Sequence, residues 1–136
     1  MDDAAARLGE LFGAHGFDRS LKGMKLLEAK DGKALVRLEV TEDVQNLGGT
    51  LHGGAIATLV DDAGTAAIVS KDRDSRPGVT TDLNVSYFNP GPGGTFVRAE
   101  ATVLKTGKTL AFVSVDVRRE ADGVLVAQGR MTKFLA

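Results

Sequence analysis

Residues 46–62 read Asn-Leu-Gly-Gly-Thr-Leu-His-Gly-Gly-Ala-Ile-Ala-Thr-Leu-Val-Asp-Asp, and the rest of the chain is organised around this stretch. Its first half predicts a loop that holds Asn46 and ends in a glycine-flanked turn at His52. Its second half predicts a helix that begins at about Gly53 and carries Asp61 two turns later. The start of a helix presents unpaired backbone N–H groups, and its dipole favours negative charge there. An amide, a bare helix start and a carboxylate are groups that carbonyl chemistry can use.

The expected helix has two unlike faces. Apolar side chains form one broad stripe, whereas Gly54, Ala57, Thr58, Asp61 and Thr65 fall on the opposite side. That side lacks the lysines and glutamates of an ordinary surface helix. Small residues permit close approach by another element, so we expect this helix to be enclosed.

The remaining periodicity predicts one more helix and six strands. The first helix covers about 2–15, and the Asp31-Gly32 turn divides 24–40 into two strands. The long helix is expected over 53–70, and the later strands over 79–88, 96–105, 110–119 and 124–134. In the expected strand over 79–88, one face carries Val79, Thr81, Leu83, Val85 and Tyr87, and the residues between them form the other face. The predicted fold class is α+β, with an antiparallel sheet of about six strands wrapped around one long helix.

Composition narrows the classes of function. With 136 residues, the chain is long enough for one domain, which we expect to span 1–136. A net charge of −1 does not indicate a protein that binds nucleic acid or an anionic membrane. Without cysteine and with two histidines, no metal site is expected. No signal peptide or membrane-spanning run is recognised, and we expect a soluble, cytoplasmic protein.

An ordered series of motifs is similar to the signature of the hotdog-fold acyl-CoA thioesterases of the PaaI-like class. The series runs through Gly49–Gly54, Ala57–Asp61, Pro77–Val79, Leu104–Lys105, Gly107–Phe112, Ser114–Asp116 and Ala127–Arg130. The resemblance implies a hotdog fold, in which the sheet surrounds the helix, and hydrolysis of an acyl-CoA thioester.

Thioester hydrolysis needs a positioned water, a group that activates it and a donor for the developing oxyanion. The N–H of Gly53 suits the donor, and Asp61 is the candidate general base or nucleophile. The resemblance matches Asn46, Gly53 and Asp61 to the family's catalytic asparagine, glycine and aspartate. It also places Thr80 where close relatives have a serine that orients water.

Each assignment has an alternative reading. The alternative for Asn46 is a residue that bonds its own loop backbone, and the alternative for Thr80 is an ordinary strand threonine. His52 either holds the turn or contacts the substrate. Asp62, next to Asp61, is interpreted as a solvated or helix-pairing carboxylate.

The resemblance also implies contacts to coenzyme A, which is part of the substrate; no cofactor is expected. These contacts fall on Tyr87, Phe88, Asn89, Pro90, Gly91, Pro92, Lys105, Thr106, Gly107, Lys108, Thr109, Leu110 and Phe134. Pro92 and Phe134 stand where a relative has lysine and histidine, so phosphate contacts are expected to be fewer or shifted. Arg130 and Lys133 are further cations on the last strand.

Spacing predicts a shared site. Gly53 and Asp61 are eight residues apart, or roughly 12 Å along a helix. One chain therefore cannot bring both to one carbonyl, and the site should combine two subunits. The resemblance implies the same arrangement, in a homodimer that commonly pairs into a homotetramer.

Two other functions are compatible with the sequence. A hotdog enoyl-CoA hydratase or dehydratase would use a histidine with a carboxylate, which keeps His52 of interest. A non-catalytic acyl-CoA binding module would not need Asp61 near the carbonyl. The acyl group is not determined by the sequence.

Overall fold

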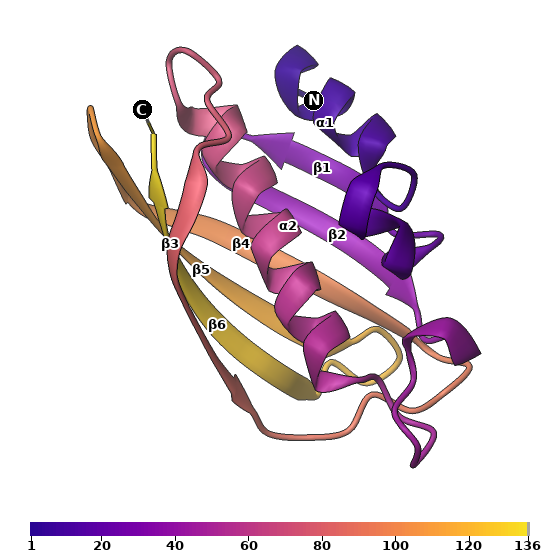
Figure 1. Ribbon diagram of the computed structural model, residues 1–136. Coiled ribbons are helices and arrows are strands. Elements are labelled where there is room, and N and C mark those ends of the chain that lie inside the picture. The colour runs from indigo at the N-terminus through magenta and orange to yellow at the C-terminus, as the bar shows by residue number, and fades with distance from the viewer. Residues whose placement is uncertain (136) are drawn as a thin grey trace.

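The computed structural model describes residues 1–135, and its elements form one sheet with one long helix (Figure 1). The helices are α1 (Asp3–Leu11) and α2 (Gly53–Lys71), with short 3₁₀ turns η1 (Gly16–Leu21) and η2 (Glu42–Val44). The strands are β1 (Lys25–Lys30), β2 (Lys33–Glu39), β3 (Val79–Tyr87), β4 (Phe96–Thr106), β5 (Leu110–Arg119) and β6 (Leu125–Phe134). All neighbouring strands are antiparallel, in the order β1-β2-β4-β5-β6-β3.

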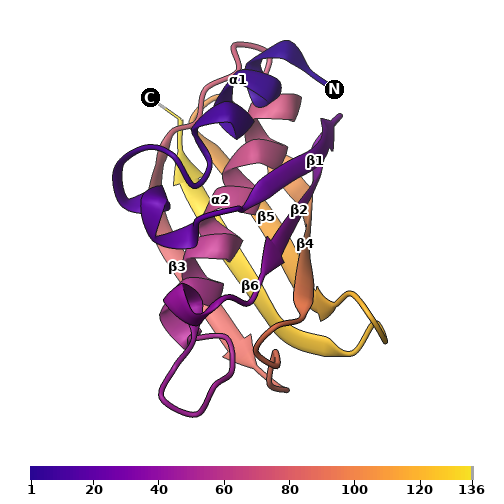
Figure 2. The ribbon, with the colours of Figure 1, turned by 90° about the vertical axis from the view of Figure 1, so that its right-hand side faces the viewer.

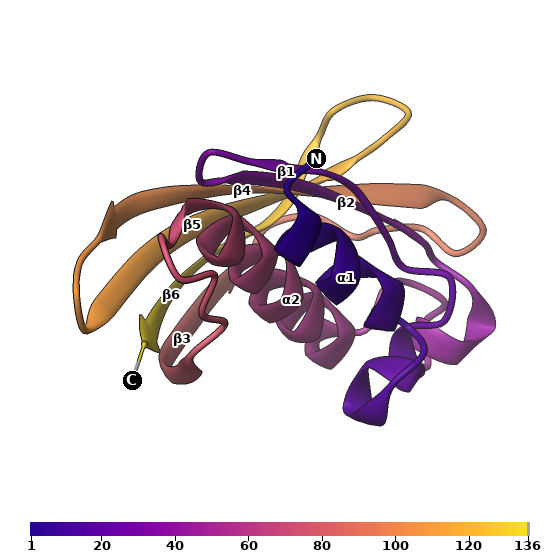
Figure 3. The same ribbon diagram turned by 90° about the horizontal axis from the view of Figure 1, so that it is seen from above.

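The sheet curves around α2, which lies along its concave face (Figures 1 and 3). Helix α1 and turn η1 lie beside α2, toward the β1 side of the sheet (Figure 2). The expected α+β architecture is confirmed. The first helix is shorter than expected, because Asp2 caps its start and the chain turns away at Phe12 before entering η1.

Local sequence explains the first hairpin. Asp31 and Gly32 join β1 to β2 with φ angles of 51° and 85°, the left-handed values that a two-residue hairpin turn requires. Along β2, Ala34, Val36 and Leu38 are buried toward the helix, as alternation predicts for a strand with one covered face.

Two glycines allow α2 to lie close to the sheet. A Cβ at Gly64 would come within 2.9 Å of Val113 Cγ1 and 2.5 Å of Met131 Cε. A Cβ at Gly129 on β6 would come within 2.7 Å of Val60 Cγ1 on the helix. Real Cβ atoms are not found so close to other carbons, so the spacing of helix and sheet depends on these positions.

Strand β3 is an edge strand and is exposed along nearly its whole length. A β-bulge interrupts its pairing with β6 between Thr80 and Asp82. On the far side of the bulge, Leu83 pairs with the buried Met131; on the near side, Thr80 pairs with the buried Lys133. Paired residues share a face of the sheet, so Thr80 faces the helix together with Leu83.

The connection from α2 to β3 is held by one ion pair. Asp72 is buried and accepts hydrogen bonds from Nε and Nη2 of Arg76, at 3.0 and 2.8 Å. Nη1 of Arg76 donates to the backbone oxygens of Lys108 and Leu135. This side chain therefore joins the loop to the β4–β5 turn and to the end of the chain. Within residues 1–135, no helix is long and apolar enough to cross a membrane.

Candidate active site

The carboxylate of Asp61 contacts the hydroxyl of Thr80 across the open side of α2. Thr80 Oγ1 donates to Asp61 Oδ1 at 2.6 Å, a short, charge-assisted hydrogen bond. Met131 Sδ lies 3.6 Å from the same hydroxyl. Asp61 is half-buried and Thr80 is exposed in the single chain. The bond fixes the carboxylate and leaves a side of the pair open to solvent or a partner.

Asp62 differs from the sequence-based interpretation of a solvated or helix-pairing carboxylate, which is wrong. Its side chain is buried, with only 8% of the residue exposed. Burial raises the pKa of Asp62 to about 9, and the neighbouring carboxyl group of Asp18 in η1 acts in the same direction. Among the described residues, Asp62 Oδ2 is buried without a hydrogen-bond partner, and Asp61 is the helix carboxylate that faces the open side.

Lys133 lies on the inner face of β6, beside these carboxyl groups. Only 6% of the residue is exposed, so it does not lie on the surface with the other candidate phosphate-binding cations. Burial lowers the pKa of the Lys133 ammonium, and the charges of Asp61 and Asp62 oppose that shift. The sequence-based prediction missed this orientation, although the buried-exposed alternation of β6 was a signal that could have found it.

The start of α2 forms a second cluster. His52 caps the helix, because its Nδ1 accepts from the N–H of Gly54 at 2.8 Å. The Tyr87 hydroxyl donates to the carbonyl of Gly53 at 2.9 Å. Among the described residues, no hydrogen bond uses the N–H of Gly53. That N–H is available to an acceptor that approaches the helix start.

Asn46 lies in the loop before this helix start. Its Oδ1 accepts from the N–H groups of Gly48 and Thr50, and its Nδ2 donates to Thr50 Oγ1 at 2.8 Å. Within one chain the amide thus bonds its own loop, which fixes its orientation. The same loop pairs with the segment after β3 through Leu51 N–H to Gly91 O, at 2.8 Å.

The expected coenzyme A contacts divide between the two ends of α2. The segment 87–92 lies at the helix start, since Tyr87 contacts Gly53 and Pro92 pairs with Thr50. The segment 105–110 lies at the other end, where Phe134 pairs with Leu110. There the β4–β5 turn and the loop after α2 border a hollow of about 750 Å³, lined by Lys71, Asp72, Arg73, Asp74, Arg76, Thr106, Gly107 and Lys108.

The structure therefore brings together some predicted site residues and separates others. Asp61 meets Thr80, while Asn46, His52, Gly53 and Tyr87 gather at the helix start. The two groups lie apart along α2, whose rise puts Gly53 and Asp61 roughly 12 Å apart. Strand β3 also runs between them, with Thr80 in one group and Tyr87 in the other. Residues 1–135 hold no cluster of three or more histidine or carboxylate side chains with the geometry of a metal site.

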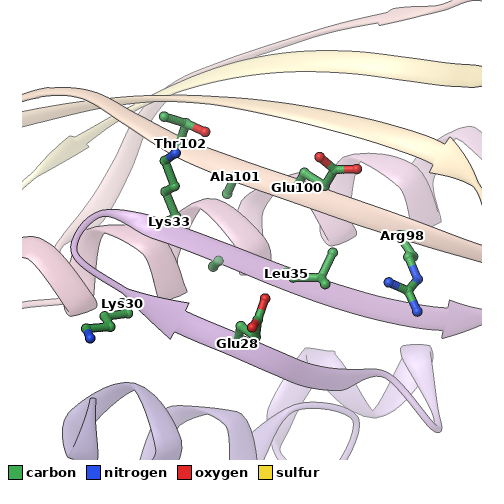
Figure 4. A pocket seen from close by; sticks show the side chains of 9 residues that line it. Glu28, Lys30, Lys33, Leu35, Arg98, Glu100, Ala101 and Thr102 are labelled. Carbon is green, nitrogen blue, oxygen red and sulfur yellow. The ribbon is translucent and has the colours of Figure 1, made fainter. Parts of the chain in front are cut away.

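A separate hollow of about 400 Å³ lies on the opposite face of the sheet (Figure 4). Lys33, Leu35, Arg98 and Glu100 extend into it from β2 and β4, away from α2. None of the predicted site residues lines it.

Comparison with known proteins gives one consistent result. The Thioesterase superfamily model matches residues 48–126, more than half of the chain. Human acyl-coenzyme A thioesterase 13 is 46% identical over 122 residues, which cover 90% of this chain and 86% of the human protein.

Solved structures agree with the sequence relatives. Zebra fish thioesterase superfamily member 2 has a TM-score of 0.90 and 43% identity, covering 97% of this chain and 98% of that one. A variant of the phenylacetic acid degradation protein PaaI from Thermus thermophilus has a TM-score of 0.78 and 33% identity, covering 88% and 98%. The expected hotdog fold is confirmed. By sequence and by structure, this chain belongs to the thioesterase superfamily.

Proposed function

We propose that this protein is an acyl-CoA thioesterase, which converts an acyl-CoA and water to a free acid and coenzyme A. The observation that carries the proposal is the 2.6 Å hydrogen bond between Thr80 and Asp61, which holds a carboxylate on the open side of α2. The name of the human relative, acyl-coenzyme A thioesterase 13, supports the same reaction.

In the proposed reaction, the thioester carbonyl oxygen accepts a hydrogen bond from the N–H of Gly53. Asp61 either takes a proton from water as that water attacks the carbonyl carbon, or attacks the carbon itself. The carbonyl oxygen becomes an oxyanion, which the helix start stabilises. The carbon–sulfur bond then breaks, and the proton that Asp61 took from water passes to the leaving thiolate of coenzyme A. If Asp61 itself attacks, this step leaves a mixed anhydride on Asp61. A water then hydrolyses the anhydride to the free acid and the Asp61 carboxylate, and its released proton goes to the thiolate. Thr80 orients the carboxylate, and no metal or cofactor takes part.

The site is proposed to form between two subunits of a homodimer. Asn46, His52 and Gly53 would come from one subunit, and Asp61 and Thr80 from the other. The roughly 12 Å between Gly53 and Asp61 supports this arrangement. So does β3, an edge strand that exposes Val79, Leu83 and Tyr87 in the single chain. Pairing of dimers into a homotetramer and a cytoplasmic location stay predictions.

Coenzyme A would then reach both kinds of binding segment in one shared site. The segment 87–92 lies with the helix start, and 105–110 with Phe134 lies at the opposite end of the helix. Two subunits related by a two-fold axis can place one segment of each type beside a single substrate.

The alternative functions receive less support from the geometry. A hydratase would use His52 as an acid or base with a carboxylate, but Nδ1 of His52 caps the helix, and among the described residues no carboxylate is hydrogen-bonded to His52. A non-catalytic binding module would not require the short bond between Asp61 and Thr80.

The test is a hydrolysis screen over acyl-CoA chain lengths and aryl-CoAs, with free thiol as the readout and with chelator present. The wild type should release coenzyme A in chelator. Asp61→Asn should lower kcat by roughly 10² or more with little change in KM, because it keeps the shape but removes the base. Asp62→Asn is the matched control and should retain most activity. Wild-type turnover that needs added divalent ion, or full activity in Asp61→Asn, would contradict the proposal.

A further inference from the structure

The peptide group between Gly53 and Gly54 is hydrogen-bonded at both of its ends. Its carbonyl oxygen, on Gly53, accepts from the Tyr87 hydroxyl at 2.9 Å, and its N–H, on Gly54, donates to Nδ1 of His52 at 2.8 Å. A Cβ at Gly54 would come within 3.1 Å of the same imidazole nitrogen, so a glycine at this position lets the imidazole lie against the helix start. Two side chains from different parts of the chain therefore hold one peptide group.

The N–H of Gly53 belongs to a ring of atoms that the bond between His52 and Gly54 closes. This ring runs through the backbone of residues 52–54 and contains the peptide group that carries the N–H of Gly53. Two successive glycines have more backbone freedom than any other pair of residues, so without further contacts the direction of this N–H would be loosely defined. An oxyanion donor is effective only where it is already aimed at the developing charge.

Tyr87 attaches this ring to the sheet. It pairs with the buried Ala127 in the β3–β6 ladder, so its side chain lies on the face toward α2. The N–H of Phe88 donates to the carbonyl oxygen of Val126 at 2.8 Å, which fixes the end of β3 to β6. The tyrosine ring packs on the helix start, since a Cβ at Gly53 would lie 3.6 Å from its Cζ. The start of α2 is thus joined to a strand end that is itself held by its neighbour.

The donor capacity of the Tyr87 hydroxyl is used within the protein. A phenol has one proton to donate, and a carbonyl oxygen can only accept, so the proton of Tyr87 is directed to Gly53. In this state the hydroxyl has no proton left to donate to coenzyme A, the role that the family resemblance implies for this segment.

We propose that Tyr87 is a positioning residue, whose hydroxyl holds the start of α2 so that the N–H of Gly53 points at the thioester carbonyl oxygen. This inference rests on the proposed role of Gly53 in hydrolysis. It assigns the hydroxyl to the reacting end of the substrate, and Tyr87 acts within the subunit that supplies Gly53.

Kinetics provide the first arm of the test, with the acyl-CoA that the wild type hydrolyses fastest in the screen. Tyr87→Phe keeps the ring and removes the hydroxyl. It should lower kcat by roughly tenfold, a part of the 10²–10³ that a whole oxyanion donor supplies, with KM changed less than about twofold. The control is Ser20→Ala, which removes a hydroxyl that donates to the carbonyl of Phe17 at 2.8 Å in η1, and it should keep both constants. A raised KM with an unchanged kcat in Tyr87→Phe would show a contact to coenzyme A and would contradict the proposal.

The second arm measures the direction of the N–H in the protein without substrate. The NMR order parameter of the Gly53 N–H should be about 0.85 in the wild type and in Ser20→Ala, and should fall toward about 0.6 in Tyr87→Phe. The N–H of Val60, which is buried in the middle of α2, should keep its order parameter in all three proteins. A fall at Val60 as well would mean that the hydroxyl supports the helix in general, and the positioning role would be wrong.

Together the two arms distinguish failure of this inference from failure of the proposed function. If the order parameter of Gly53 is the same in Tyr87→Phe and the wild type, the inference is wrong, whether or not the protein hydrolyses thioesters. If it falls while kcat stays at the wild-type value, the direction of this N–H does not matter to the reaction, and the inference is wrong again. If it falls but the wild type hydrolyses no acyl-CoA, Tyr87 does hold the helix start and the proposed function fails.

Discussion

Asp61 and Asp62 are adjacent and chemically identical, yet the structure gives them opposite environments. Asp61 bonds to a hydroxyl at the open side of the helix, whereas Asp62 is buried against η1. The 100° between successive helix positions produces the difference. Two like groups that are held in different environments are a recurrent arrangement in enzymes.

Asp62 gives the stability of the protein a definite pH dependence. Its pKa is about 9 in the folded protein, against an ordinary value of 3.8 in the unfolded chain. Between these values the folded state holds a proton that the unfolded state has lost, so stability falls as pH rises, by at most about 1.4 kcal/mol per pH unit from this group. Asp62→Asn should remove that slope.

Urea unfolding at about pH 5, 7 and 9 measures this effect. We expect the stability advantage of Asp62→Asn over the wild type to grow as the pH rises through this range. The exposed Asp43→Asn is the control and should follow the wild type at each pH. A constant difference between Asp62→Asn and the wild type would show that the buried carboxyl is not protonated in the folded state.

At the scale of elements, α2 and the sheet are fitted to one another through glycine. Gly129→Ala would press a methyl group against Val60 and should destabilise the protein by about 1–3 kcal/mol, as overpacking does. In a Val60→Ala background the same substitution should cost much less, because the obstructing methyl groups are gone. A double-mutant cycle from urea unfolding gives the coupling energy. Additive costs would mean that the two elements separate freely.

The local sequence pattern was sufficient to predict most element boundaries. It was not sufficient to predict which side chains of β3 and β6 face the helix. The expected helix over 53–70 and strands over 110–119 and 124–134 agree with the observed bounds within one residue. The expected face of 79–88 is correct for Leu83, Val85 and Tyr87 but not for Thr80, because a bulge is not visible in alternation alone. The burial of Lys133 and Asp62 was missed because both residue types usually indicate solvent.

At the scale of the whole molecule, the strand order could not be predicted from periodicity. β3 follows α2 in sequence but pairs with β6, the last strand, and so lies at the far edge from β1. This crossover places Thr80 beside Asp61 and leaves one edge of the sheet uncovered (Figure 1). Which residues from two chains would share a site depends on an assembly that no single-chain pattern encodes.

Complementation tests the shared site. Asp61→Asn and Asn46→Ala should each be nearly inactive alone. In a mixed dimer, the site that pairs Asn46 of the first chain with Asp61 of the second is intact, and the other site lacks both groups. Random pairing makes about half of the dimers mixed, so co-refolding should restore activity to roughly a quarter of the wild type.

The control for this experiment is each variant refolded alone at the same concentration. If both groups acted within one chain, every site in every pairing would lack one of them. Activity of the mixture no higher than the mean of the two variants would therefore place the whole site in one subunit.

Because of the bulge in β3, the face of the sheet to which the first residues of this strand point depends on the number of residues in the strand. Thr81 is the extra residue that brings Thr80 round to the same side as Leu83. Replacing Thr81 changes a side chain, whereas deleting it would reverse the side to which every earlier residue of the strand points. Between Pro77 and Leu83, the number of residues therefore matters more than their identity. An alignment that places a gap there assigns inward-facing positions to the outer face of the sheet and outward-facing positions to the inner face.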